Sequence, residues 1–191
     1  MTTNIKITSF AVMLLLAAAC GPKKDDSKKE AEAENKEALK GSDMKEDAEW
    51  AVKIADGGML EVRVAELAQT NAKSGDVKSF AQMMIKDHSM ANDELKALAE
   101  RKGITLPATL SNDSQNKYDD LAKKTGKDFD EAYSDMMVDD HQKTVDAFKK
   151  EADKGNDPDI KSWASGKIAT LEHHLEMAKQ TEDKAEKEKK K

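Results

Sequence analysis

The chain has 191 residues and a formal net charge of −6 at pH 7, with 37% charged and only 4% aromatic residues. An acidic chain without a basic face lacks the positive charge on which nucleic-acid affinity depends, so nucleic-acid binding is excluded as a leading function. Its single cysteine, Cys20, has no second cysteine with which to form an internal disulfide.

The first 19 residues are predicted to be a signal peptide. Lys6 precedes an apolar run from Ile7 to Ala19 that is too short to span a bilayer but has the length of a signal-peptide core. Small residues end the run directly before Cys20, as in the cleavage motif of bacterial lipoproteins. We therefore expect Cys20 to be lipidated and to anchor the protein in the cell envelope, at the outer membrane, facing the periplasm or the cell surface.

The ends of the mature chain are predicted to lie outside the folded domain. Residues 20–42 mix lysines with acidic residues and show no apolar periodicity, so they are expected to form a disordered, flexible tether. Residues 183–191 are expected to form a charged tail. Between them, residues 43–182 are expected to form one domain.

Helical periodicity runs through this domain, and no segment alternates as a strand does. Four helices are predicted: from about Ser42 to Ala72 with a possible break at Gly57-Gly58, from Val77 to Gly103, from Ser114 to Lys154 with a weak point at Gly126, and from Pro158 onward. Short turns join the first pair and the last pair, which makes each pair antiparallel. The expected fold is all-α, an antiparallel four-helix bundle.

Three of the four histidines occupy positions where an apolar residue is expected. His88, His141 and His174 fall in the seams of three helices, and the remaining helix offers Glu61. Glu61 precedes the Ser74-Gly75 turn by as many residues as His88 follows it, so these two should be level. Burying polar groups costs a few kcal/mol unless they find partners, so the placement needs a reason.

Two reasons remain open. Imidazole and carboxylate groups ligate Zn, Fe, Mn and Ni, so Glu61, His88, His141 and His174 could form a four-ligand metal site. The same side chains could instead hydrogen-bond one another and fix the register of the helices. Asp87 and Asp140 directly precede two of the histidines and could each orient a histidine ring on the adjacent helix, or lie in a solvated rim.

Other metal chemistry receives less support. The Glu-x-x-His motif of di-iron bundles is absent, because Ile85, Val138 and Leu171 stand three residues before the histidines. The Met83-Met84 and Met136-Met137 pairs are expected to fill gaps in the core, so copper ranks below the other metals. His173 falls off the seam and is expected to be exposed.

Several motifs resemble the family named domain of unknown function 4142. They follow one another between Ala48 and Lys179: Gly58-Met-Leu-Glu61-Val, Val77 to His88, Asn92-Asp-Glu-Leu95, Phe129-Asp-x-x-Tyr133, His141 and Thr170-Leu-Glu-His-His-Leu175. The resemblance implies an exported bacterial protein, often a lipoprotein, with a ferritin-like bundle. Glu61, Asp87, His88, His141 and His174 fall on the family's motif positions. No reaction is implied.

The leading hypothesis from the sequence is a lipid-anchored helical bundle of the cell envelope that is not an enzyme and binds a transition metal through its Glu/His cluster. One alternative is a metal-dependent redox or stress-protection enzyme that uses the same cluster. The other is a purely structural envelope protein.

Overall fold

The computed structural model describes residues 26–189, and over this range the protein is all-α, as predicted. Six helices follow one another along the chain: α1 (Ser27–Ala38), α2 (Lys45–Asn71), α3 (Gly75–Lys102), α4 (Asn112–Ala122), α5 (Gly126–Lys154) and α6 (Pro158–Lys189). No helix in this range is long and apolar enough to cross a membrane. The predicted signal peptide and Cys20 lie outside the described residues.

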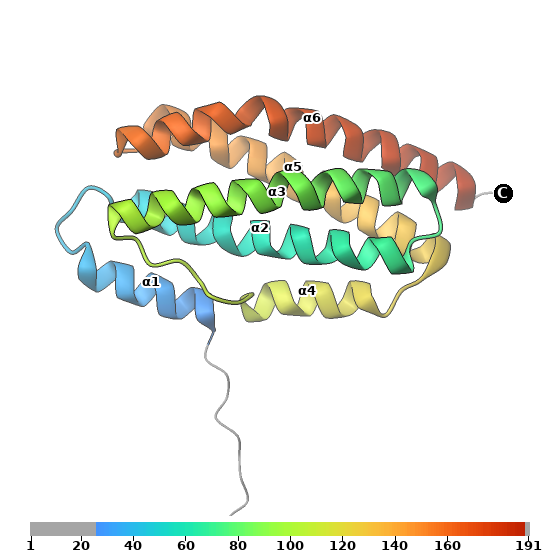
Figure 1. Cartoon of the computed structure of the whole chain (residues 1–191), viewed down its shortest axis with the longest axis horizontal. Helices are drawn as coiled ribbons and strands as arrows, with labels where there is room; N and C mark the ends of the chain where they lie inside the picture. The colour runs from blue at the N-terminus through green and yellow to red at the C-terminus, as the bar shows by residue number, and fades with distance from the viewer. Residues whose placement is uncertain (1–25, 190–191) are drawn as a thin grey trace, which may run out of the picture.

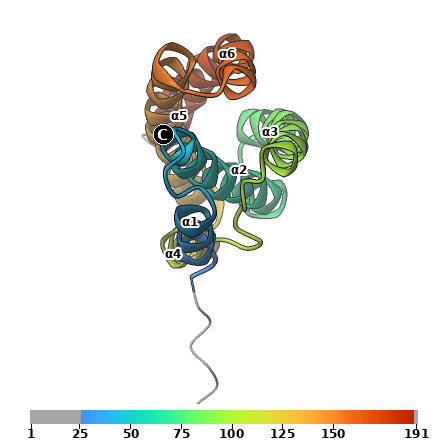
Figure 2. The ribbon, with the colours of Figure 1, turned by 90° about the vertical axis from the view of Figure 1, so that its left-hand side faces the viewer.

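The four long helices form two antiparallel hairpins, α2 with α3 and α5 with α6 (Figure 1). The chain that joins the hairpins returns along the bundle through α4, so α3 and α5 run in the same direction (Figure 1). The two short helices α1 and α4 lie on the side of the bundle opposite α6 (Figure 2). Six helices rather than the expected four therefore make up the described chain.

The predicted third helix, Ser114 to Lys154, is two helices. The chain breaks after Ala122 and resumes at Gly126, whose positive φ of 64° suits a residue without a Cβ. Asn71 at the end of α2 donates a side-chain hydrogen bond to the carbonyl of Lys124 in this break. The expected break at Gly57-Gly58 is absent, because α2 runs through it with buried residues such as Val52 and Leu60 on both sides.

The prediction of a flexible tether over residues 20–42 is wrong for residues 27–38, which form α1. Asp26 caps this helix, and Asn35 is buried with 3% of its surface exposed. The Asn35 side chain donates to the carbonyl of Thr105 and accepts from the Thr105 amide, at 2.8 and 2.7 Å. A distant loop thus supplies the partners that hold α1, which composition alone does not reveal.

The predicted charged tail over residues 183–191 is also helical for most of its length, because α6 continues to Lys189. Ala185 is buried there against the bundle.

Two buried aspartates tie the hairpins together at opposite ends of the bundle. Asp130 of α5 accepts hydrogen bonds from the backbone amides of Lys73 and Ser74 in the α2–α3 turn. Asp47 of α2 accepts from the backbone amides of Asn156 and Asp157 in the α5–α6 turn. Each hairpin therefore carries the carboxylate that satisfies the other hairpin's turn, which fixes the two hairpins in register.

Candidate metal centre

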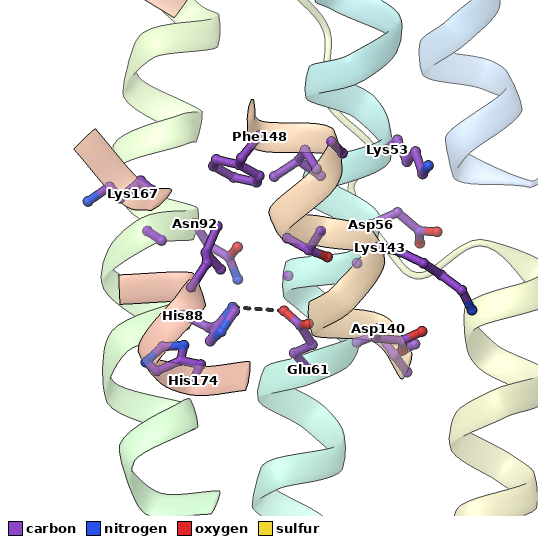
Figure 3. A pocket seen from close by; sticks show the side chains of 18 of the residues that line it. Lys53, Asp56, Glu61, His88, Asn92, Asp140, Lys143, Phe148, Lys167 and His174 are labelled. Atoms are coloured by element: carbon purple, nitrogen blue, oxygen red, sulfur yellow. Dashed lines mark ion pairs between the residues drawn. The ribbon is translucent and has the colours of Figure 1, made fainter. Parts of the chain in front are cut away.

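Four long helices each contribute one polar side chain to a single buried layer. The rings of His88, His141 and His174 lie with centroids 5.2 to 5.6 Å apart, and Glu61 lies beside His88. All four side chains are less than a tenth exposed. Figure 3 shows the Glu61–His88 contact and His174 next to it. The expectation that Glu61 and His88 lie level is confirmed, and His141 and His174 join them in the same layer.

One ring nitrogen of each histidine is engaged by an acceptor outside the ring cluster. His88 donates through Nδ1 to Glu61 at 2.8 Å, and His141 donates through Nδ1 to the carbonyl of Met137 at 2.9 Å. His174 donates through Nε2 to Asp87 at 3.1 Å. Because carboxylates and carbonyls only accept here, these contacts place the proton on the engaged nitrogen and leave the other nitrogen with a lone pair.

The other three nitrogens are buried and have no hydrogen-bond partner: Nε2 of His88, Nε2 of His141 and Nδ1 of His174. One ligating nitrogen from each ring lies within 4.8 Å of the other two. Buried polar atoms are almost always paired, so three unpaired lone pairs in one place require an explanation. They match a metal site whose ligands are oriented by hydrogen bonds to their far nitrogens.

The electrostatics of the layer are dominated by one negative charge, on Glu61, which favours positive charge on its neighbours. Burial alone would raise the pKa of Glu61, but the neighbouring histidines and the bond from His88 lower it to about 2. Burial opposes a charge on His88, yet Glu61 outweighs it and raises that pKa. Burial lowers the pKa of His141, and it lowers that of His174 to about 4, so both rings are neutral at pH 7.

The structure separates the predicted site residues into two roles. The three histidines form the group of possible ligands, whereas Glu61 lies outside that group and bonds to His88, with His141 Nδ1 3.8 Å away. Asp87 contacts His174 on the adjacent helix, as the sequence allowed. Asp140 instead pairs with Lys117 at 3.2 Å and forms no hydrogen bond or ion pair with a histidine among residues 26–189. His173 is exposed, as predicted.

A cavity of about 520 Å³ begins at His88 and His174 and extends toward Phe148 and Trp163. Phe148, Asn92 and His88 lie on successive levels of this pocket (Figure 3). Sequence reasoning missed the pocket, because it interpreted Gly57-Gly58 as a break in the helix. The sequence did contain a signal for the pocket. Each histidine has a polar residue three or four positions away on the same helix face: Asn92, Thr144 and Thr170.

Two solved structures share this fold. One is described as CopM in the Cu(I)-bound form, with a TM-score of 0.59 and 19% identity, and the match covers 70% of this chain and 93% of that one. The other is CopM in the Cu(II)-bound form, with a TM-score of 0.61, 17% identity and coverage of 72% and 96%. No curated protein matches the sequence.

The family comparison matches most of the folded chain. The profile of the family described as domain of unknown function (DUF4142) aligns with residues 28–181. This range contains the whole histidine layer and every helix except the first residue of α1 and the end of α6. The chain therefore belongs to the DUF4142 family.

Proposed function

We propose that the protein binds one transition-metal ion between His88, His141 and His174, and that it acts as a metal-binding protein rather than an enzyme. The observation that carries the proposal is the set of three buried ring nitrogens without hydrogen-bond partners. Their far nitrogens already donate to Glu61, to a backbone carbonyl and to Asp87, so the lone pairs are aimed before any ion arrives.

Copper is the first candidate ion, ahead of the zinc, iron, manganese and nickel favoured by the sequence. The expected ring of ligands included a carboxylate, but the structure leaves only imidazoles, and manganese prefers carboxylate oxygen. Among divalent first-row ions, nitrogen sites bind Cu²⁺ most tightly. The two solved structures with this fold are described as copper-bound, which supports the same choice.

A pair of neighbouring histidines provides a matched test. His174 is 1% exposed and belongs to the layer, whereas the adjacent His173 is exposed and outside it. We expect the wild-type protein, lacking residues 1–19 and stripped of metal, to bind one equivalent of copper by calorimetry and by competition with a chelator. His174→Ala should lose more than the roughly 10- to 100-fold typical of an outer partner, and His173→Ala should match wild type.

Thermal unfolding gives a second readout, because an ion that binds only the folded state stabilises it by about 2.7 kcal/mol at one hundred times its Kd. Wild type and His173→Ala should melt at higher temperature with copper, and His174→Ala should not. If wild type takes up none of the five metals, or if His174→Ala binds as wild type does, the proposal is wrong. Turnover of peroxide by the loaded protein would instead favour the enzymatic alternative.

We also propose that Cys20 anchors the protein in the bacterial envelope. The apolar run before Cys20 and the small residues next to it support this. Because α1 begins at Ser27, the seven Cα–Cα steps from Cys20 would hold the start of α1 within about 25 Å of the lipid. Cys20→Ser should abolish fatty-acid labelling and release the protein from membranes, and labelling that persists would contradict the anchor.

A further inference from the structure

The pocket above the histidine layer exists because α2 lacks side chains where the pocket runs. Gly57 and Gly58 stand one turn before Glu61, and each costs a helix interior about 1 kcal/mol relative to alanine. A Cβ on Gly57 would meet no atom within 4 Å, so that position faces open space. A Cβ on Gly58 would lie 2.1 Å from Oδ1 of Asn92, which packs on the bare backbone. Gly57 therefore leaves space open, and Gly58 makes room for the Asn92 side chain.

Three polar side chains line the pocket one helical turn above the histidines. Asn92 follows His88 by four residues, Thr144 follows His141 by three, and Thr170 precedes His174 by four. Since α3 and α5 run together and α6 runs against them, these offsets place all three at the same end of the layer. No hydrogen bond to their side chains is found among residues 26–189, so they are free to bind another molecule.

The charges around the pocket favour an anionic head group. The carboxylates Asp56, Glu94 and Asp140 are already paired, with Ser111 and Ser114, with Lys167 and Trp163, and with Lys117. Lys53 and Lys143 line the pocket on one side, and no ion pair involves either within the described chain (Figure 3). Lys28 and Asp113 also line the pocket without an ion pair in residues 26–189, so the unpaired groups are three ammoniums, one carboxylate, two hydroxyls and an amide.

The remaining wall is apolar. Ile54, Leu60, Phe148, Leu171 and Trp163 line the cavity from three helices. A volume of about 520 Å³ exceeds what a metal ion needs and falls in the range of small-molecule sites, which are mostly apolar with a few placed polar groups. The pocket is therefore shaped for an organic molecule.

We propose that this pocket binds a small amphipathic carboxylate. Its carboxylate accepts hydrogen bonds from the layer of Asn92, Thr144 and Thr170, and its apolar or aromatic body packs against Phe148, Leu171 and Trp163. The site does not depend on the proposed metal, because none of the groups that hold the ligand is one of the three histidines. It is a second binding site stacked on the first.

Two glycines allow a matched test. Gly57→Leu places a side chain in the pocket, and Gly166→Leu places the same side chain in open space on α6 outside it. Leucine suits both helix interiors, so both variants are expected to fold, with wild-type circular dichroism and cooperative melting. Binding of 3-phenylpropionate to the metal-free protein is measured by calorimetry and by tryptophan fluorescence, to which Trp163 in the pocket contributes, with 3-phenylpropylamine as the cationic counterpart.

We expect saturable binding of 3-phenylpropionate to wild type and to Gly166→Leu, and at least about tenfold weaker binding to Gly57→Leu. The amine should also bind at least about tenfold more weakly than the acid. Absence of saturable binding to wild type, equal binding by Gly57→Leu, or preference for the amine would each overturn the proposal. Because the measurement uses metal-free protein, a failure here is distinct from a failure of the histidine site.

Discussion

The interior of the bundle differs on the two sides of the histidine layer. Toward the α2–α3 turn it is filled by large side chains, with Phe80, Met84, Phe129, Tyr133 and Met137 almost fully buried in one cluster. Toward the α5–α6 turn the layer borders the pocket, with two glycines and three polar side chains, before a second apolar cluster that includes Leu95 and Ile160 fills the end of the bundle. Rigid packing on one side can hold the histidine rings in position, while the pocket on the other side gives molecules access to them. A binding site requires both.

The packed side should be the more sensitive to loss of volume. Phe129 is fully buried and stacks on Tyr133 with ring centroids 5.8 Å apart, so Phe129→Ala should cost about 3–5 kcal/mol by urea unfolding. Phe148 borders the pocket, where a new cavity merges with an existing one. Phe148→Ala should therefore destabilise less, and equal losses would contradict the contrast between the two sides.

Metal binding by the histidine layer should weaken when a residue that orients one of the histidine rings is removed. Asp87→Ala removes the acceptor of His174 and should weaken metal binding by roughly 10- to 100-fold in a competition titration. Asp140→Ala is the matched control, because Asp140 also precedes a layer histidine but pairs with Lys117 at the surface. That variant should stay within about twofold of wild type. Similar losses in both variants would argue against an orienting role for Asp87.

The smallest expected effect is on the pH dependence of stability, and it comes from Glu151, beyond the pocket and near the α5–α6 turn. Burial, followed by the nearby Asp47 carboxylate, raises the pKa of Glu151 to about 7, above its ordinary value of 4.5. The folded state then binds more protons than the unfolded state between these values, so this group lowers stability as the pH rises from about 4.5 to about 7. Above pH 7 its contribution no longer changes.

Glu151→Gln cannot ionise, so the variant should become more stable relative to wild type as the pH rises through this window, by about 1–2 kcal/mol after allowance for solvent screening. Urea unfolding at pH 5, 6, 7 and 8 measures the difference. A difference that stays constant with pH would show that Glu151 ionises normally.

Local patterns were sufficient to predict much of the described protein. Apolar periodicity identified the long helices, and the equal spacing of Glu61 and His88 from one turn predicted their contact, because helical rise per residue is constant. Polar residues in apolar seams likewise marked His88, His141 and His174 as buried, but whether they form one layer or two depended on the loop between the hairpins.

Contacts between segments far apart in the sequence decided the rest. The helix α1 is held by Thr105, which local composition did not show. The break before α5, which the sequence marked only as a weak point at Gly126, is held by a bond from Asn71. Only the tertiary structure separated the ligand-like histidines from Glu61, since the two roles depend on which nitrogen each neighbour engages. The sequence by itself determined the long helices and the polar positions in their seams, whereas packing between helices brought those positions into one layer and determined the free lone pairs and the pocket beside them.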